Sequence, residues 1–89
     1  MNKHKYPTEI PHYEGRLDEL VEFIVGRLRY DKAVLLHQAL AARYKQESGV
    51  ERARGRLRLA LRLEQVGSAE EHAAEKMATV WKICEPHTE

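Results

Sequence analysis

Metal-binding and nucleophilic side chains occur in the sequence, but their spacing does not assemble a recognisable site. Cys84 and His87 are spaced like half of a zinc site, and no second pair at zinc-finger spacing exists. Neither a His-Glu-x-x-His motif nor a glycine-rich phosphate loop is present. Cys84 falls on the apolar face of an expected helix, where a thiol is typically inert. The sequence therefore predicts no metal, no cofactor and no catalytic residue, and we expect a non-enzymatic protein.

Charged residues form two rows with helical spacing. The acidic row is Glu14, Asp18 and Glu22, and the basic row is Arg54, Arg58 and Arg62. Like charges four residues apart on a helix cost about 0.2–0.5 kcal/mol per pair, which solvent and salt can offset on an exposed face. Alternatively, one row faces the other. Both rows lie on the same side of their apolar faces, so they fit each other better between two copies than within one chain.

Nucleic-acid binding is the alternative interpretation of the arginines. Five of them fall in a short stretch that contains one acidic residue, Glu51. A helix-turn-helix centred on Gly49 would need a small residue at Lys45 and an aliphatic one at Gly55, and the sequence provides neither. The formal net charge of +1 also disfavours binding through bulk charge.

The stretch 50–66 carries apolar residues on two opposite faces of a helix. At about 100° per residue, the first face contains Val50, Ala53, Leu57, Ala60 and Leu61. The second face contains Leu59, Leu63 and Val66. A surface helix of a monomer needs only one such face. This helix is therefore expected to lie between two neighbours or to offer its second face to a partner chain.

Hydrophobic periodicity predicts an all-α fold, a small bundle of three to four helices. The expected helices cover 12–29, 31–47, 49–66 and 69–84. A shift in apolar phase near Tyr30 separates the first two, although one continuous helix remains an alternative. Ser48 with Glu51, and Ser68 with Glu71, match the capping box that starts a helix. Residues 56–64 also alternate like a strand, but their leucines, arginines and alanine favour helix.

The expected domain organisation is an extended arm over 1–11, a single helical domain over 12–85 and a short tail over 86–89. Pro7 and Pro11 disfavour helix in the arm, and Pro86 ends the last helix. Trp81 shares a face with Met77 and Cys84, so we expect it to be buried.

Composition favours a folded cytoplasmic protein. Of 89 residues, 43% are hydrophobic and 33% charged, and no run of about 18 apolar residues could cross a membrane. One cysteine cannot form an internal disulfide, which fits a reducing compartment. The sequence thus predicts a helical protein–protein interaction module, an adaptor, inhibitor or regulator, that self-associates as a homodimer. Its candidate surface comprises Leu59, Leu63, Val66 and the two charged rows.

Overall fold

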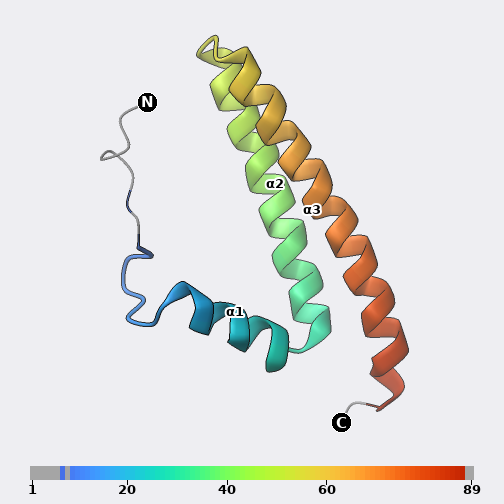
Figure 1. Ribbon diagram of the computed structural model, residues 1–89. Coiled ribbons are helices and arrows are strands. Elements are labelled where there is room, and N and C mark those ends of the chain that lie inside the picture. The colour runs from blue at the N-terminus through green and yellow to red at the C-terminus, as the bar shows by residue number, and fades with distance from the viewer. Residues whose placement is uncertain (1–6, 8, 88–89) are drawn as a thin grey trace.

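The computed structural model is all-helical, and it describes residues 7 and 9–87 (Figure 1). It contains α1 (Leu17–Gly26), α2 (Tyr30–Ala53) and α3 (Leu57–Cys84), followed by a 3₁₀ turn, Glu85–His87. The all-α prediction is confirmed, and residues 57–64 are helical rather than extended. Helices α2 and α3 lie side by side as an antiparallel hairpin, and α1 projects from the base of that hairpin.

The predicted boundaries in the second half of the chain are wrong. Instead of three shorter helices, α2 continues through Ser48 and Gly49 to Ala53, and α3 runs from Leu57 through Gly67 and Ser68. The two Ser–Gly pairs lie inside long helices, where no helix start needs a cap. Ser48 and Gly67 lie instead where α2 and α3 approach each other.

The hairpin turn lies at Gly55. This residue has φ +79°, a conformation that glycine adopts without the steric penalty of a Cβ. The amide of Arg56 donates to the carbonyl of Glu51 over 2.9 Å, and the amide of Gly55 donates to that of Arg52 over 3.0 Å. This pair of bonds is the Schellman motif, which satisfies carbonyls at the end of a helix.

Replacing Gly55 with alanine should lower the free energy of unfolding by about 1 kcal/mol, because a Cβ is strained at this positive φ. Gly55→Asn should lose less, since asparagine tolerates the left-handed region. Urea unfolding at one fixed protein concentration measures both changes. Equal stability of the alanine variant and the unchanged chain would contradict the assigned turn.

The contact between α2 and α3 is a seam of small residues. Gly67 lies so near α2 that an added Cβ would be 2.7 Å from Cγ of Lys45 and 3.2 Å from the carbonyl oxygen of Ala41. The hydroxyl of Ser48 donates to the carbonyl of Ala60 across the seam over 2.7 Å. The buried small residues are Ala33, Ala41 and Ser48 on α2 and Ala60, Gly67 and Ala74 on α3. On α3 they recur every seven residues, which keeps one narrow stripe toward the neighbouring helix.

This seam is not a hydrophobic core in the usual sense. Among the described residues, the only buried hydrophobic side chains are four alanines, and no leucine, isoleucine, valine or aromatic side chain is buried. Burying one leucine side chain contributes about 1.5–3 kcal/mol, far more than an alanine methyl. The prediction that Trp81 is buried is wrong, because this side chain is only half-buried at the base of the hairpin.

Helix α1 is shorter than predicted, and no residue of it is buried. It begins at Leu17 rather than at residue 12, because Arg16 has extended backbone and its carbonyl accepts the first helical amides, from Glu19 and Leu20. The predicted break from the next helix is confirmed, since residues 27–29 separate α1 from α2. Most of the expected arm, residues 1–6 and 8, and the end of the expected tail, 88–89, lie outside the described residues.

Candidate interaction surface

Two polar contacts across the hairpin distinguish its two sides. On one side, His37 Nδ1 and Glu70 Oε2 are hydrogen-bonded at 2.5 Å. On the opposite side, Lys45 Nζ donates to Glu71 Oε1 over 2.7 Å. That hydrogen bond raises the pKa of Lys45, and burial acts against it. Because successive helical residues turn by about 100°, these contacts show which other side chains lie on each side.

The side marked by His37 and Glu70 is largely apolar. Helical spacing of three, four or seven residues places Leu40 and Tyr44 on this side of α2, in line with His37. The same spacing places the three residues of the predicted second face on this side of α3, in line with Glu70. We call this group the hairpin patch: Leu40, Tyr44, Leu59, Leu63 and Val66.

The hairpin patch is open to solvent in the single chain. Leu59 is 37% exposed and Val66 41%, Tyr44 is 36% exposed, and Leu40 and Leu63 are half-buried. The sequence predicts Leu59, Leu63 and Val66 as an interaction surface; none of the three is buried in the single chain, and their role in binding stays a prediction. Leu40 and Tyr44 of α2 join this surface, which the periodicity of α3 could not show, because it carries no information about the helix beside it.

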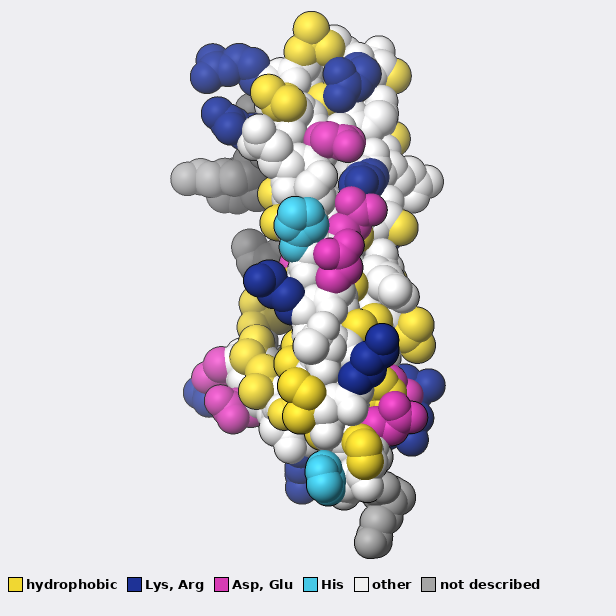
Figure 2. Space-filling model, turned by 90° about the vertical axis from the view of Figure 1, so that its right-hand side faces the viewer, with side chains coloured by type: hydrophobic (Ala, Val, Ile, Leu, Met, Phe, Trp, Pro, Cys, Tyr) yellow, Lys and Arg dark blue, Asp and Glu magenta, His cyan; other side chains and the backbone are white. Residues whose placement is uncertain are grey.

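The predicted first face of the same stretch is divided by the structure. Ala60 is fully buried in the seam, whereas Leu57 and Leu61 are 61% and 52% exposed. Figure 2, which views the molecule from the side of α3, shows hydrophobic side chains near both ends of the hairpin with charged and histidine side chains between them. Helix α3 therefore has one covered stripe of small residues and exposed leucines on either side of it.

The predicted basic row does not exist as one row. Arg54 is the residue that ends α2, and only Arg58 and Arg62 share α3. Arg54 and Arg56 both bind the carboxylate of Glu51, at 3.2 and 3.1 Å. Glu51 is 4% exposed, so these two arginines compensate a buried negative charge next to the turn. The predicted capping-box role of Glu51 is wrong, because this residue lies near the end of α2 and not at a helix start.

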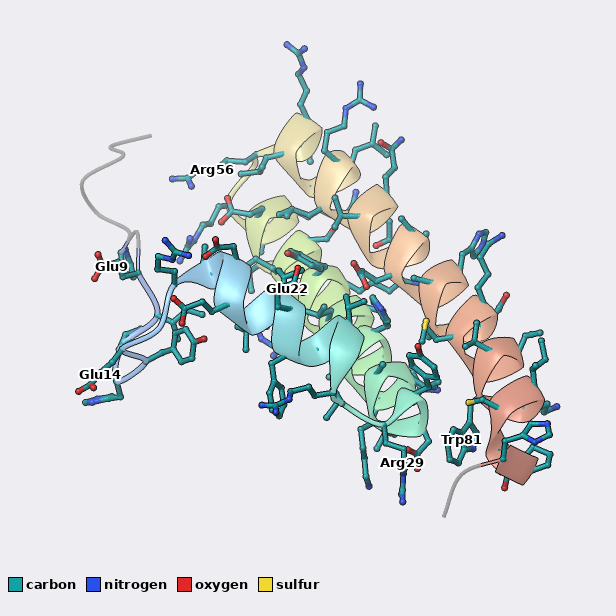
Figure 3. All side chains as sticks on the ribbon, turned by 60° about the horizontal axis from the view of Figure 1, so that its bottom comes forward. Glu9, Glu14, Glu22, Arg29, Arg56 and Trp81 are labelled. Atoms are coloured by element: carbon teal, nitrogen blue, oxygen red, sulfur yellow. The ribbon has the colours of Figure 1, made fainter. Side chains whose placement is uncertain are left out.

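The predicted acidic row is also divided. Glu14 precedes α1, whereas Asp18 and Glu22 lie on it (Figure 3). Asp18 is bound by Arg16, whose Nε lies 3.2 Å from its carboxylate. None of the ion pairs found in the described part of the chain connects the acidic row with the basic row. Pairing of the two rows between copies stays a prediction.

A second apolar surface lies at the base of the hairpin. A groove of about 310 Å³ is lined by Ile24 and Val25 of α1 together with residues of α2 and α3. Near it, Arg29 stacks over the ring of Trp81, 5.6 Å from its centre, and the two labelled side chains can be seen in Figure 3. Arg29 also forms two hydrogen bonds to Asp31, which lower the pKa of that carboxyl group. Helix α1 thus borders the base of the hairpin on the side marked by His37.

The described residues, 7 and 9–87, can also be compared with what a metal site, a reactive thiol or a membrane-spanning helix requires. Within them, no three His, Cys, Asp or Glu side chains come together as metal ligands would. Cys84 is half-buried, and its thiol lies 3.6 Å from the carbonyl of Trp81. No helix among these residues is sufficiently long and apolar to cross a membrane. No family model, curated protein or solved structure matches the chain.

Proposed function

We propose that this chain is a non-enzymatic helical interaction module, an adaptor, inhibitor or regulator, that self-associates as a homodimer. The observation that carries the proposal is the absence of any large buried apolar side chain among the described residues, together with the open hairpin patch. A two-helix seam of alanine, serine and glycine buries little apolar area, so further burial must come from association. The single cysteine fits a reducing compartment, and we place the module in the cytoplasm.

Light scattering should give twice the chain mass of 10.3 kDa at micromolar concentrations. Self-association supplies the apolar burial that the single chain lacks, so dilution should lower both the mass and the thermal midpoint. A mass of one chain, independent of concentration, would contradict the proposed homodimer.

A nucleic-acid-associated regulator is the second candidate. Arg52 and Arg58 are exposed close to the hairpin turn and take part in none of the described ion pairs with carboxylates. Phosphate contacts of this kind would make binding to duplex DNA or to RNA fall steeply with salt. If the chain is not retained on duplex DNA or on RNA even at low salt, this candidate is excluded.

A further inference from the structure

Glu47 and Arg62 lie at the two edges of the hairpin patch, and Arg43 lies one turn before Glu47 on the α2 edge. Glu47 lies on the patch side of α2, three residues beyond Tyr44, and Arg62 lies on the patch side of α3, three residues beyond Leu59. Ser48 is opposite Ala60 across the seam, so Glu47 is opposite residue 61. Glu47 and Arg62 are therefore at nearly the same height on the hairpin, about 1.5 Å apart along its axis. The apolar patch lies between them.

We propose that a second copy of this chain covers the hairpin patch, related by a two-fold axis that runs along the hairpin, with both turns at the same end. This inference rests on the proposed function and names the surface and orientation of the association. A rotation about that axis places α2 of each copy on α3 of the other, which makes a four-helix core from two patches. Glu47 of each copy then faces Arg62 of the other.

The alternative orientation does not bring Glu47 to Arg62. A two-fold axis perpendicular to the hairpin would place α2 on α2 and α3 on α3, so that Glu47 would meet the α2 edge of the other copy, which carries both Arg43 and Glu47, and Arg62 would meet the α3 edge. Charge complementarity selects orientation in this way even where each ion pair contributes little affinity. In the single chain, Glu47 is 3.5 Å from Arg43 and Arg62 donates to Gln65 over 2.9 Å. Both side chains remain partly exposed, so neither contact prevents an ion pair with the second copy.

A pair of matched substitutions tests the surface. Leu63→Asp places a charge in the hairpin patch and should weaken the dimer about 100-fold. Leu61→Asp makes the same change two residues earlier, at a side chain that is 52% exposed and lies outside the patch, and should change the dimer dissociation constant less than about threefold. Circular dichroism should show that both variants stay helical. If the Leu63→Asp chain dimerises as tightly as the unchanged chain, the proposed surface is overturned. If the unchanged chain is itself monomeric, the proposed function is overturned.

Charge exchange at the edges tests the orientation without altering the apolar patch. Arg62→Glu should weaken the dimer about tenfold, because two glutamates then face each other twice per dimer. Adding Glu47→Arg to the same chain should restore most of that loss. Rescue by Glu22→Lys in place of Glu47→Arg would instead show that α1 of the second copy faces α3, which overturns the proposed orientation. If neither Glu47→Arg nor Glu22→Lys restores dimerisation of the Arg62→Glu chain, the proposed orientation is overturned as well.

A spin label at the base of the hairpin gives an independent measure of orientation. In a Cys84→Ser background, Lys82→Cys places the label about 27 Å along the axis from the centre of the patch. With both turns at the same end, the two labels lie at the same height, and the distance between them should stay below about 35 Å. The perpendicular axis would separate them by more than about 50 Å, and that distance would overturn the proposal.

Discussion

Gly67→Leu should lower the free energy of unfolding by about 3 kcal/mol. Even a Cβ at this position would lie 2.7 Å from Cγ of Lys45 and 3.2 Å from the carbonyl oxygen of Ala41. Cγ of Lys45 is close to the Lys45 backbone rather than at the flexible end of the side chain, and the carbonyl oxygen of Ala41 is a backbone atom. A leucine would therefore have to push α2 and α3 apart along the seam, and overpacking of this kind costs about 1–3 kcal/mol or more.

Gly49→Leu is the matched control for that change. Gly49 also lies inside a helix, but an added Cβ there meets nothing within 4 Å. Leucine has a higher helix propensity than glycine, so this variant should be as stable as the unchanged chain or more stable by up to about 1 kcal/mol. Urea unfolding followed by circular dichroism measures both variants at one protein concentration. Equal destabilisation by the two leucines would contradict the close approach of the helices at Gly67.

Ser48→Leu should cost about 2–3 kcal/mol for a related reason. The side chain of Ser48 is almost fully enclosed, with 1% of the residue exposed, and its hydroxyl donates to the carbonyl of Ala60. Leucine would remove this hydrogen bond, which contributes about 1 kcal/mol, and would also have to fit a volume sized for serine. The smaller change Ser48→Ala should lose only the hydrogen bond, about 1 kcal/mol.

Ser68→Leu provides the comparison for the serine. Ser68 is half-buried on α3, beside the seam rather than within it. Its replacement should change stability by less than about 0.5 kcal/mol, as substitutions outside packed contacts do. Thermal unfolding of the three serine variants measures these differences. If Ser68→Leu lowers the stability as much as Ser48→Leu does, the two serines have the same structural role.

The sequence alone determined the helical nature of the chain and the exposed second face of α3. Periodicity of 3.6 residues and strong helix formers are local properties, and they specify a helix whatever its neighbours are. The same periodicity puts Leu59, Leu63 and Val66 on one side of α3, and none of the three is buried. The shift in apolar phase near Tyr30 also predicted a break there, and α1 ends at Gly26 while α2 begins at Tyr30.

Only the tertiary structure decided what Ser48, Gly49, Gly67 and Ser68 do. Serine next to glycine is typical of helix ends, and a capping box has the same composition as a close helix contact. Which of the two forms depends on whether another helix lies against those residues. In this hairpin, α2 and α3 approach closely at Ser48 and Gly67, so the small residues remain helical and the chain turns at Gly55 instead.

The charged rows show the same dependence on tertiary structure. Spacing of four residues places Arg54, Arg58 and Arg62 on one face only if a single helix contains them all. The turn at Gly55 separates Arg54 from the other two and turns it toward the buried carboxylate of Glu51. Whether Arg54 pairs with Glu51 or continues the row depends on where α2 ends, and the spacing of the arginines carries no information about that. The similar heights of Glu47 and Arg62 likewise follow only from the pairing of α2 and α3 at the seam.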